Sequence, residues 1–199
     1  MTLGSLSSGS AAQEGGQAVA RTWLSIRVEL VGGRGVDLWP RPGRVFAAAR
    51  SHSFRQLADE IDLAFARWDL AHMHMFTLAG GSEVTALDWD GEAPDGAVDS
   101  EKTKLSRLTP GEQFAYVFDF GDDWAHLCTL ATARIDPVDE LGIVPAEPQP
   151  YFGWGDLPDQ YGRRCDGDDG ESPEPRRPSR LTADLPPILP WWGPRQRGR

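Results

Sequence analysis

The residues best suited to chemistry in this sequence are histidines and aspartates in two short blocks. Two of the histidines stand two residues apart in an apolar run that predicts a strand over 72–78, so both imidazoles would point to one face of a sheet. Imidazole and carboxylate groups suit zinc, manganese or iron, and a bound metal would polarise water for hydrolysis. The sequence therefore predicts a candidate site for a divalent metal. Its ligands would be His72, His74, Asp119, Asp122 and His126.

The same side chains also fit a structural role. Aspartate suits a turn because its carboxylate bonds to nearby backbone N–H groups, and Gly121 can supply a positive φ. In that interpretation His72 ends the loop before the strand and His74 packs or hydrogen bonds in the core. The sequence is compatible with both the metal site and the structural role. Without the metal, no cofactor is expected.

Aromatic residues suggest a second kind of site. Trp68 and Trp124 flank the polar blocks and could line a groove for a ligand or a peptide, or could pack beneath the sheet. The stretch 151–162 is rich in Gly and aromatic residues, and we expect an ordered loop that either clamps the core or forms a contact surface. The candidate binding residues are Trp68, Trp124, Trp154 and Tyr161.

Strands must position these groups. Alternating apolar residues predict a strand over 23–30, and two aromatic-rich runs predict a hairpin with strands 113–119 and 124–132 around a turn at 120–123. Weaker patterns indicate extended chain at 36–50, 84–87 and 105–108, and loops at 88–100 and after 137.

A helix is predicted before the second polar block. Ser53, with Gln56 three residues later, is typical of a capping box at a helix start, and the apolar pattern fades near 68–69. Leu63 is among the residues of the apolar pattern, most of which fall on one stripe, and Asp62 is among the polar residues that occupy the rest of the helix.

Length and composition favour one domain with a real core, at 199 residues and 40% hydrophobic content. The predicted class is α+β, with an antiparallel sheet, one or two packed helices, and disordered N- and C-terminal tails. The predicted boundaries are a tail at 1–20, the domain at 21–162, and a flexible Pro- and Arg-rich tail at 163–199.

The net charge of −10 disfavours binding to nucleic-acid phosphates, except through the C-terminal tail. The tail arginines could instead contact an acidic partner or remain solvated. Two cysteines are too few for a disulfide framework, and neither a signal peptide nor a membrane-spanning run is recognised. We therefore expect a soluble cytoplasmic protein. The tail arginines are Arg176, Arg177, Arg180, Arg195, Arg197 and Arg199.

Three blocks of the sequence together resemble a known family. They run from Ser53 to Phe65, from Trp68 to Phe76, and from Tyr116 to His126. The third block is similar to the family's pattern of tyrosine, Asp-Phe-Gly-Asp, tryptophan and histidine. Over roughly residues 22–162 the chain resembles the plasmid pRiA ORF-three-like family, whose members also carry the label insertion-element passenger TnpR.

This resemblance implies an α+β domain with an antiparallel sheet and helices on one side, and it implies no established reaction. The family's cysteine-containing segment is replaced here by Phe152–Gly162, so a role of that cysteine does not carry over. The label suggests a resolvase, but the sequence lacks a nucleophilic serine backed by several arginines and a helical DNA-binding domain.

Three functions follow as hypotheses. The first is a binding or accessory module of this family, associated with mobile elements through the family label, with an unknown protein or small molecule as partner. The second is a metal-dependent hydrolase or nuclease that uses the His and Asp cluster. The third is a nucleic-acid accessory protein that acts through the arginine-rich tail.

Overall fold

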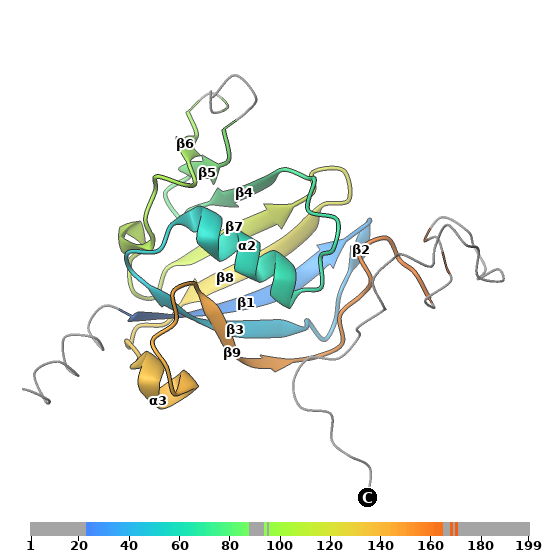
Figure 1. Ribbon diagram of the computed structural model, residues 1–199. Coiled ribbons are helices and arrows are strands. Elements are labelled where there is room, and N and C mark those ends of the chain that lie inside the picture. Colours follow the sequence, from blue (N-terminus) through green and yellow to red (C-terminus); the bar gives the residue numbers. More distant parts are fainter. Residues whose placement is uncertain (1–22, 88–93, 95, 165–167, 169, 171–199) are drawn as a thin grey trace, which may run out of the picture.

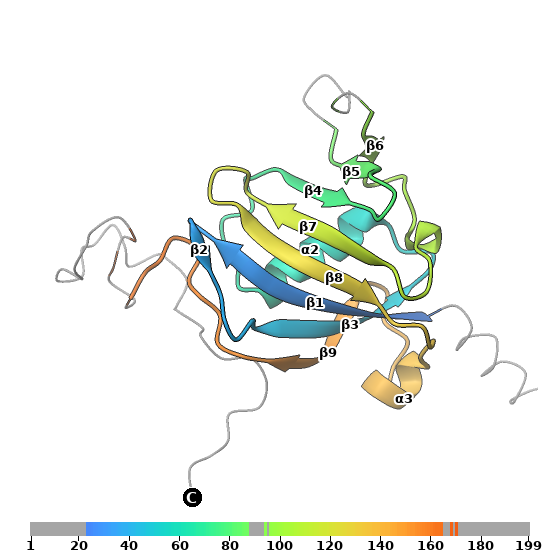
Figure 2. The same ribbon diagram turned by 180° about the vertical axis from the view of Figure 1, so that it is seen from behind.

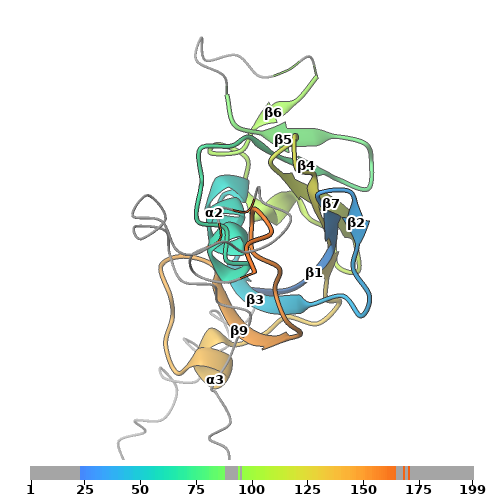
Figure 3. The ribbon, with the colours of Figure 1, turned by 90° about the vertical axis from the view of Figure 1, so that its right-hand side faces the viewer.

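The computed structural model describes residues 23–87, 94, 96–164, 168 and 170. The tails predicted over 1–20 and 163–199, with the tail arginines, lie wholly or mostly outside these residues. In the described part, the strands form one sheet, and helix α2 (Phe54–Ala64) lies across one face of it (Figure 1). The sheet curves around α2, whereas none of the described helices runs across the opposite face (Figures 2 and 3). The predicted α+β class is confirmed.

The sheet has the strand order β6-β5-β4-β7-β8-β1-β3-β9, and β2 pairs with β1. All of the described pairs are antiparallel except β5 with β6, which is parallel, so the sheet is mixed instead of purely antiparallel. The strands are β1 (Trp23–Gly33), β2 (Val36–Asp37), β3 (Gly43–Ala49), β4 (His74–Thr77), β5 (Glu83–Thr85), β6 (Val98–Asp99), β7 (Gln113–Phe118), β8 (Trp124–Leu130) and β9 (Gln149–Trp154).

The core lies between α2 and the sheet face that it covers. Side chains alternate along a strand, so every second residue of β1, β7 and β8 points toward the helix. The predicted hairpin is confirmed, with β7 and β8 joined by the turn at 119–123. On its helix-facing side are Phe114, Tyr116, Phe118, Trp124, His126, Cys128 and Leu130, all of which are buried.

Helix α2 begins as the sequence predicts and ends earlier. The Ser53 hydroxyl accepts a hydrogen bond from the Gln56 N–H at 3.1 Å, and the Gln56 side chain accepts one from the Ser53 N–H at 2.7 Å. The predicted end near 68–69 is wrong, because Ala66 adopts a left-handed conformation with φ 58° directly after the cap residue Phe65. The residues after Ala66 therefore leave the helix axis and lead toward the sheet end.

One position on each face of α2 differs from the prediction. Leu63 is 59% exposed, whereas Asp62 is only 4% exposed and accepts a hydrogen bond from the Tyr116 hydroxyl at 2.8 Å. Burial raises the pKa of Asp62 to about 8, although the Tyr116 hydrogen bond and the charge of Arg67 oppose the shift. Asp62 is therefore mainly protonated at neutral pH.

Other elements also differ from the predictions. Strand β4 begins at His74 instead of residue 72, and the extended piece predicted at 105–108 is a single 3₁₀ turn, η1 (Leu105–Arg107). Strand β9 and helix α3 (Pro137–Leu141) replace part of the region predicted as loop. Strand β9 tolerates Pro150 because it lies at the edge of the sheet.

The sequence around helix α3 contains the usual signals of a helix start and end. The Asp136 side chain caps the N–H of Val138 at 2.9 Å, Pro137 occupies the first turn, and Gly142 ends the helix with φ 76°.

No helix in the ranges that the structure describes is long and apolar enough to span a bilayer.

The rings of two tryptophans pack directly against the backbone of glycine residues. A Cβ atom at Gly33 would overlap the ring of Trp124, and a Cβ atom at Gly43 would overlap the ring of Trp154. Each glycine therefore makes room for an indole ring on its neighbouring strand, β8 beside β1 and β9 beside β3.

The raised pKa of Asp62 predicts that stability falls as pH rises. The folded state binds the carboxyl proton more tightly than the unfolded chain, so this stabilisation is complete below the ordinary pKa of 3.8 and is lost as the pH passes about 8. Each pKa unit corresponds to about 1.4 kcal/mol. Asp62→Asn should remove this slope in urea unfolding between about pH 5 and about pH 8.

Asp59→Asn is the matched control, because the Asp59 side chain on the same helix is 49% exposed and pairs with Arg55. It should leave the difference in unfolding free energy between the two pH values unchanged. The same pH slope in Asp62→Asn and in the natural protein would contradict the burial of an acidic group at this position.

Candidate functional site

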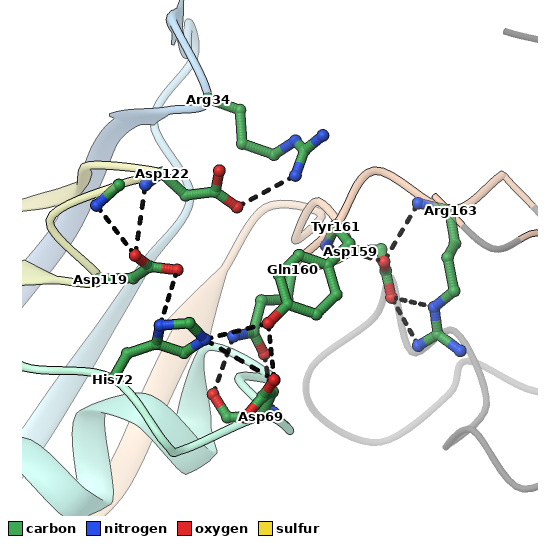
Figure 4. Close-up of polar contacts among 10 residues, drawn as sticks. Arg34, Asp69, His72, Asp119, Asp122, Asp159, Gln160, Tyr161 and Arg163 are labelled. Atoms are coloured by element: carbon green, nitrogen blue, oxygen red, sulfur yellow. Dashed lines mark hydrogen bonds and ion pairs between the residues drawn. The ribbon is translucent and has the colours of Figure 1, made fainter. Parts of the chain in front are cut away.

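Polar side chains from four segments meet at one end of the sheet (Figure 4). The segments are the β1–β2 connection, the chain between α2 and β4, the β7–β8 turn, and the chain after β9. We call this group the sheet-end network. It consists of Arg34, Asp69, His72, Asp119, Asp122, Asp159, Gln160, Tyr161 and Arg163.

The β7–β8 turn is shaped by its own carboxylate. Asp119 Oδ1 accepts hydrogen bonds from the N–H groups of Gly121 at 2.9 Å and Asp122 at 3.3 Å. Positive φ occurs at Asp119 (57°) and Asp123 (52°) and not at Gly121, which the sequence had suggested for that role. Aspartate tolerates this conformation because its side chain bonds to the local backbone.

His72 lies between two carboxylates and a phenol. Its Nδ1 is 3.3 Å from Asp119 Oδ2, and its Nε2 is 3.0 Å from the Tyr161 hydroxyl and 3.6 Å from Asp69 Oδ2. The Tyr161 hydroxyl donates to Asp69 Oδ2 at 2.7 Å. Because the single Tyr161 hydroxyl proton is donated to Asp69, the Tyr161 oxygen can only accept from Nε2–H of His72, whereas Nδ1–H would donate to Asp119.

The Asp69–Tyr161 contact also changes the proton affinity of both groups. The hydrogen bond from Tyr161 is the main cause of the lowered pKa of Asp69. Burial and then the contact with Asp69 raise the pKa of Tyr161 above its ordinary value. Tyr161 therefore remains a phenol and Asp69 a carboxylate over the ordinary pH range, which favours their hydrogen bond.

The chain at 159–163 is fastened by side chains. Gln160 is fully buried, its Oε1 accepts from the N–H groups of Trp68 at 2.8 Å and Asp69 at 2.9 Å, and its Nε2 donates to the Asp69 carbonyl at 2.9 Å. Burial alone would raise the pKa of Asp159, but the hydrogen bonds from Arg163 outweigh it and the pKa is lowered. A buried ion pair between Asp159 Oδ2 and Arg163 Nη2, at 2.6 Å, links the two ends of this segment.

The five predicted metal ligands do not all converge. His72 and Asp119 are in contact, and Asp122 instead pairs with Arg34 at 3.0 Å. His74 and His126 are buried on the helix-facing side of the sheet, with rings 6.1 and 5.4 Å from Tyr116. Burial lowers their pKa values to about 4 and about 3, so both are neutral at pH 7. Among the residues that the structure covers, no three His, Cys, Asp or Glu side chains are placed to hold a metal together.

The four predicted aromatic binding residues are also separated. Trp68 and Tyr161 pack edge to face at 5.1 Å beside the network. Trp124 is 2% exposed and belongs to the core, so it does not line an open groove. Trp154 lies in β9, where its indole N–H donates to the Arg41 carbonyl at 2.9 Å.

Sequence reasoning missed several members of this site. Asp69 lies within one of the three family-like blocks, but the sequence did not identify it as a site residue. Gln160 has no sequence pattern that predicts its role, because its hydrogen-bond partners are about ninety positions away. Arg67 was missed as well, although it is 2% exposed and its guanidinium lies 3.7 Å over the Trp124 ring. A single arginine after a helix has no periodic pattern that would mark it as buried.

The sequence model of plasmid pRiA4b ORF-3-like proteins matches residues 25–143, which include the helix, both polar blocks and the β7–β8 hairpin. The chain belongs to the plasmid pRiA4b ORF-3-like protein family. The predicted family is therefore confirmed. Segment 159–163, which completes the network, follows the matched region.

This ORF-3-like protein is similar in fold to a solved structure. It is the crystal structure of MM3350, a protein of unknown function from Methanosarcina mazei Go1, with a TM-score of 0.54 and 20% sequence identity. The likeness covers 71% of this chain and 74% of that chain, and at this identity it shows the fold alone. No curated protein matches the chain.

The groups at the centre of the sheet-end network are committed to one another. The carboxylates of Asp69 and Asp119, the His72 ring and the Tyr161 hydroxyl all have partners within the protein. The arrangement therefore acts first as a joint that holds three segments of the ORF-3-like domain in fixed positions.

Loss of the Tyr161 hydroxyl should loosen segment 159–163. Tyr161→Phe keeps the ring on Trp68 but removes a hydrogen bond to a carboxylate, a contact worth about 1.5–3 kcal/mol. We expect the amides of Trp68 and Asp69 to exchange hydrogen about tenfold faster, measured by mass spectrometry or NMR.

Tyr151→Phe is the control, since that hydroxyl bonds to Ser25 Oγ at 2.8 Å on another part of the sheet. It should leave the exchange of the Trp68 and Asp69 amides unchanged. Equal exchange in Tyr161→Phe and in the natural protein would mean that the hydroxyl does not fasten the segment.

Proposed function

We propose that this ORF-3-like domain is a binding module that contacts a polypeptide partner at the sheet-end network. The observation that carries the proposal is the exposure of apolar side chains beside a network whose own groups are already paired. Leu70, Met73 and Phe120 are 51%, 40% and 54% exposed. Each of them is next in the chain to a network residue: Asp69, His72 and Asp119, respectively.

The backbone supports one continuous contact area. The Asp119 N–H donates to the Met73 carbonyl at 2.9 Å, so the strand that leads to Phe120 runs beside the segment that carries Met73. The network holds both segments in place, which lowers the entropy lost when a partner binds. Exposed apolar side chains on a fixed backbone are typical of protein contact sites.

Charge indicates the chemistry of the partner. Asp69, Asp122 and Asp123 lie in the same two segments as the apolar side chains, and the chain carries a net charge of −10. Arg34 offsets only one of these carboxylates. The surface therefore suits a segment that combines apolar side chains with lysine or arginine.

The other functional hypotheses receive less support. A metal-dependent hydrolase would need His74 and His126 beside Asp119, but both imidazoles are buried next to Tyr116. The nucleic-acid hypothesis concerns tail residues outside the described chain. A cytoplasmic location and an association with mobile elements are parts of the proposal that rest on the sequence and on the family label.

The proposal predicts that basic, apolar peptides bind and that Phe120 contributes to their affinity. The probe is an array of short fluorescent peptides that combine Lys or Arg with Leu or Phe, and the comparison set has Glu in place of each basic residue. Phe120→Ser should weaken the binding of the best basic peptide at least about fivefold in fluorescence anisotropy, as expected for a central apolar contact.

Ile143→Ser is the matched control, because Ile143 is 60% exposed but follows α3 instead of adjoining the network. It should bind the peptides as the natural protein does. Equal affinity for acidic and basic peptides, or binding that does not depend on Phe120, would exclude this surface as the contact site.

A further inference from the structure

Arg67 is a buried cation that has no hydrogen-bond partner among the described residues. The residue is 2% exposed, and all three of its guanidinium nitrogens lack a hydrogen bond within the part of the chain that the structure describes. Buried polar groups nearly always have partners, and an unpaired charge is the most unfavourable exception. Arg67 therefore needs an explanation beyond packing.

The position of Arg67 is well defined. It directly follows Ala66, whose left-handed conformation ends the helical segment, and its backbone N–H donates to the Asp62 carbonyl at 2.8 Å. Its guanidinium lies 3.7 Å over the Trp124 ring. Stacking on an aromatic face holds the planar group in place while its N–H groups, which lie at the edge, remain able to donate.

Further unpaired polar atoms lie on the residues around this guanidinium. The indole Nε1 of Trp124 is buried without a hydrogen-bond partner among the described residues. Both ring nitrogens of His126 are buried and have no side-chain partner there, although the backbone at Tyr116 and Trp124 acts on the ring. Arg67 acts electrostatically on His126 and contributes to the lowered pKa of that ring. Guanidinium, indole N–H and neutral imidazole together offer several donors and few acceptors.

The local charge is positive at neutral pH. Burial lowers the pKa of Arg67 to about 10, so the side chain still carries its proton at pH 7. Asp62 is one of its neighbouring acids, but the pKa of Asp62 is about 8, and its Oδ1 already accepts from Tyr116. Asp159 and Asp122 also act on Arg67, although Asp159 is paired with Arg163 and Asp122 with Arg34. A negatively charged ligand would neutralise the remaining positive charge of Arg67.

We propose that Arg67, the indole N–H of Trp124 and the His126 imidazole form a binding site for a phosphate group, free or at the end of a small phosphomonoester. Phosphate offers several acceptor oxygens and accepts two parallel hydrogen bonds from one guanidinium. A carboxylate has only two oxygens and would leave more of these donors unpaired. The site is distinct from the exposed surface around Phe120.

Access to the site involves the chain at 159–163. Trp68 is adjacent to Arg67, and Gln160 and Tyr161 fasten this chain to residues 68–72 through side-chain contacts. A transient release of this chain from residues 68–72 would uncover the end of the helical segment. Tyr161→Phe should therefore increase the rate of phosphate association.

Thermal unfolding of the full chain tests the proposal. The melting temperature should rise with the concentration of inorganic phosphate, because a ligand that binds only the folded state stabilises it. Sodium chloride at equal ionic strength should not produce this rise. Methyl phosphate is the second probe: an equal rise indicates that the site takes monoesters, and a rise with inorganic phosphate alone indicates the free anion.

Arg67→Met should abolish the phosphate-dependent rise, whereas Arg55→Met should retain it. Arg55 is an arginine on α2 itself, with a 43% exposed side chain that pairs with Asp59. If Arg67→Met does not fold, Arg67→Lys provides the test by calorimetry. It should bind phosphate at least tenfold more weakly, because lysine cannot form the two parallel hydrogen bonds.

Trp124→Phe keeps an aromatic face beneath the guanidinium and removes the indole N–H, so it should weaken phosphate binding severalfold. The absence of any phosphate-specific rise in the natural protein would overturn the proposal. A full rise in folded Arg67→Met, or unchanged affinity in Arg67→Lys, would overturn it as well.

Discussion

The register of the β7–β8 hairpin is the constraint on which the rest of this structure depends. Tyr116 pairs with His126 and Phe118 with Trp124, so all four side chains point toward α2. A shift of one residue in one strand would turn its side chains to the opposite face. Such a shift would remove the hydrogen bond from Tyr116 to Asp62 and the stacking of Arg67 on Trp124. It would also change the direction of the turn.

The chain that links α2 to β4 contributes to two polar environments with opposite character. The outer one, around His72, pairs acids with donors and leaves little unused capacity. The inner one, around Arg67, contains donors that the described residues do not satisfy. The outer environment suits a rigid joint. The inner one lowers stability unless a ligand completes it, as is common where function and stability compete.

The features that the sequence predicted well are local ones. The capping box joins Ser53 and Gln56 within one helical turn, and alternation along the hairpin identified its two faces. Predictions from the sequence were wrong or missing where a side chain has partners far away in the sequence, or where a residue occurs in an element that usually excludes it. Gln160 finds its partners about ninety positions away, Asp62 is an acid on the apolar stripe, and β9 is a strand despite Pro150. Burial of a polar residue depends on tertiary partners, which periodicity does not encode.

The two contacts between a glycine and an indole ring have a consequence for how this family can vary. Trp124 fills the space over Gly33, and Trp154 fills the space over Gly43. A larger residue at either glycine is compatible with the fold only if its tryptophan becomes smaller, and a smaller residue at the tryptophan leaves a cavity unless the glycine gains a side chain. We therefore expect each pair to vary as one unit in evolution, with substitutions tolerated jointly and selected against singly.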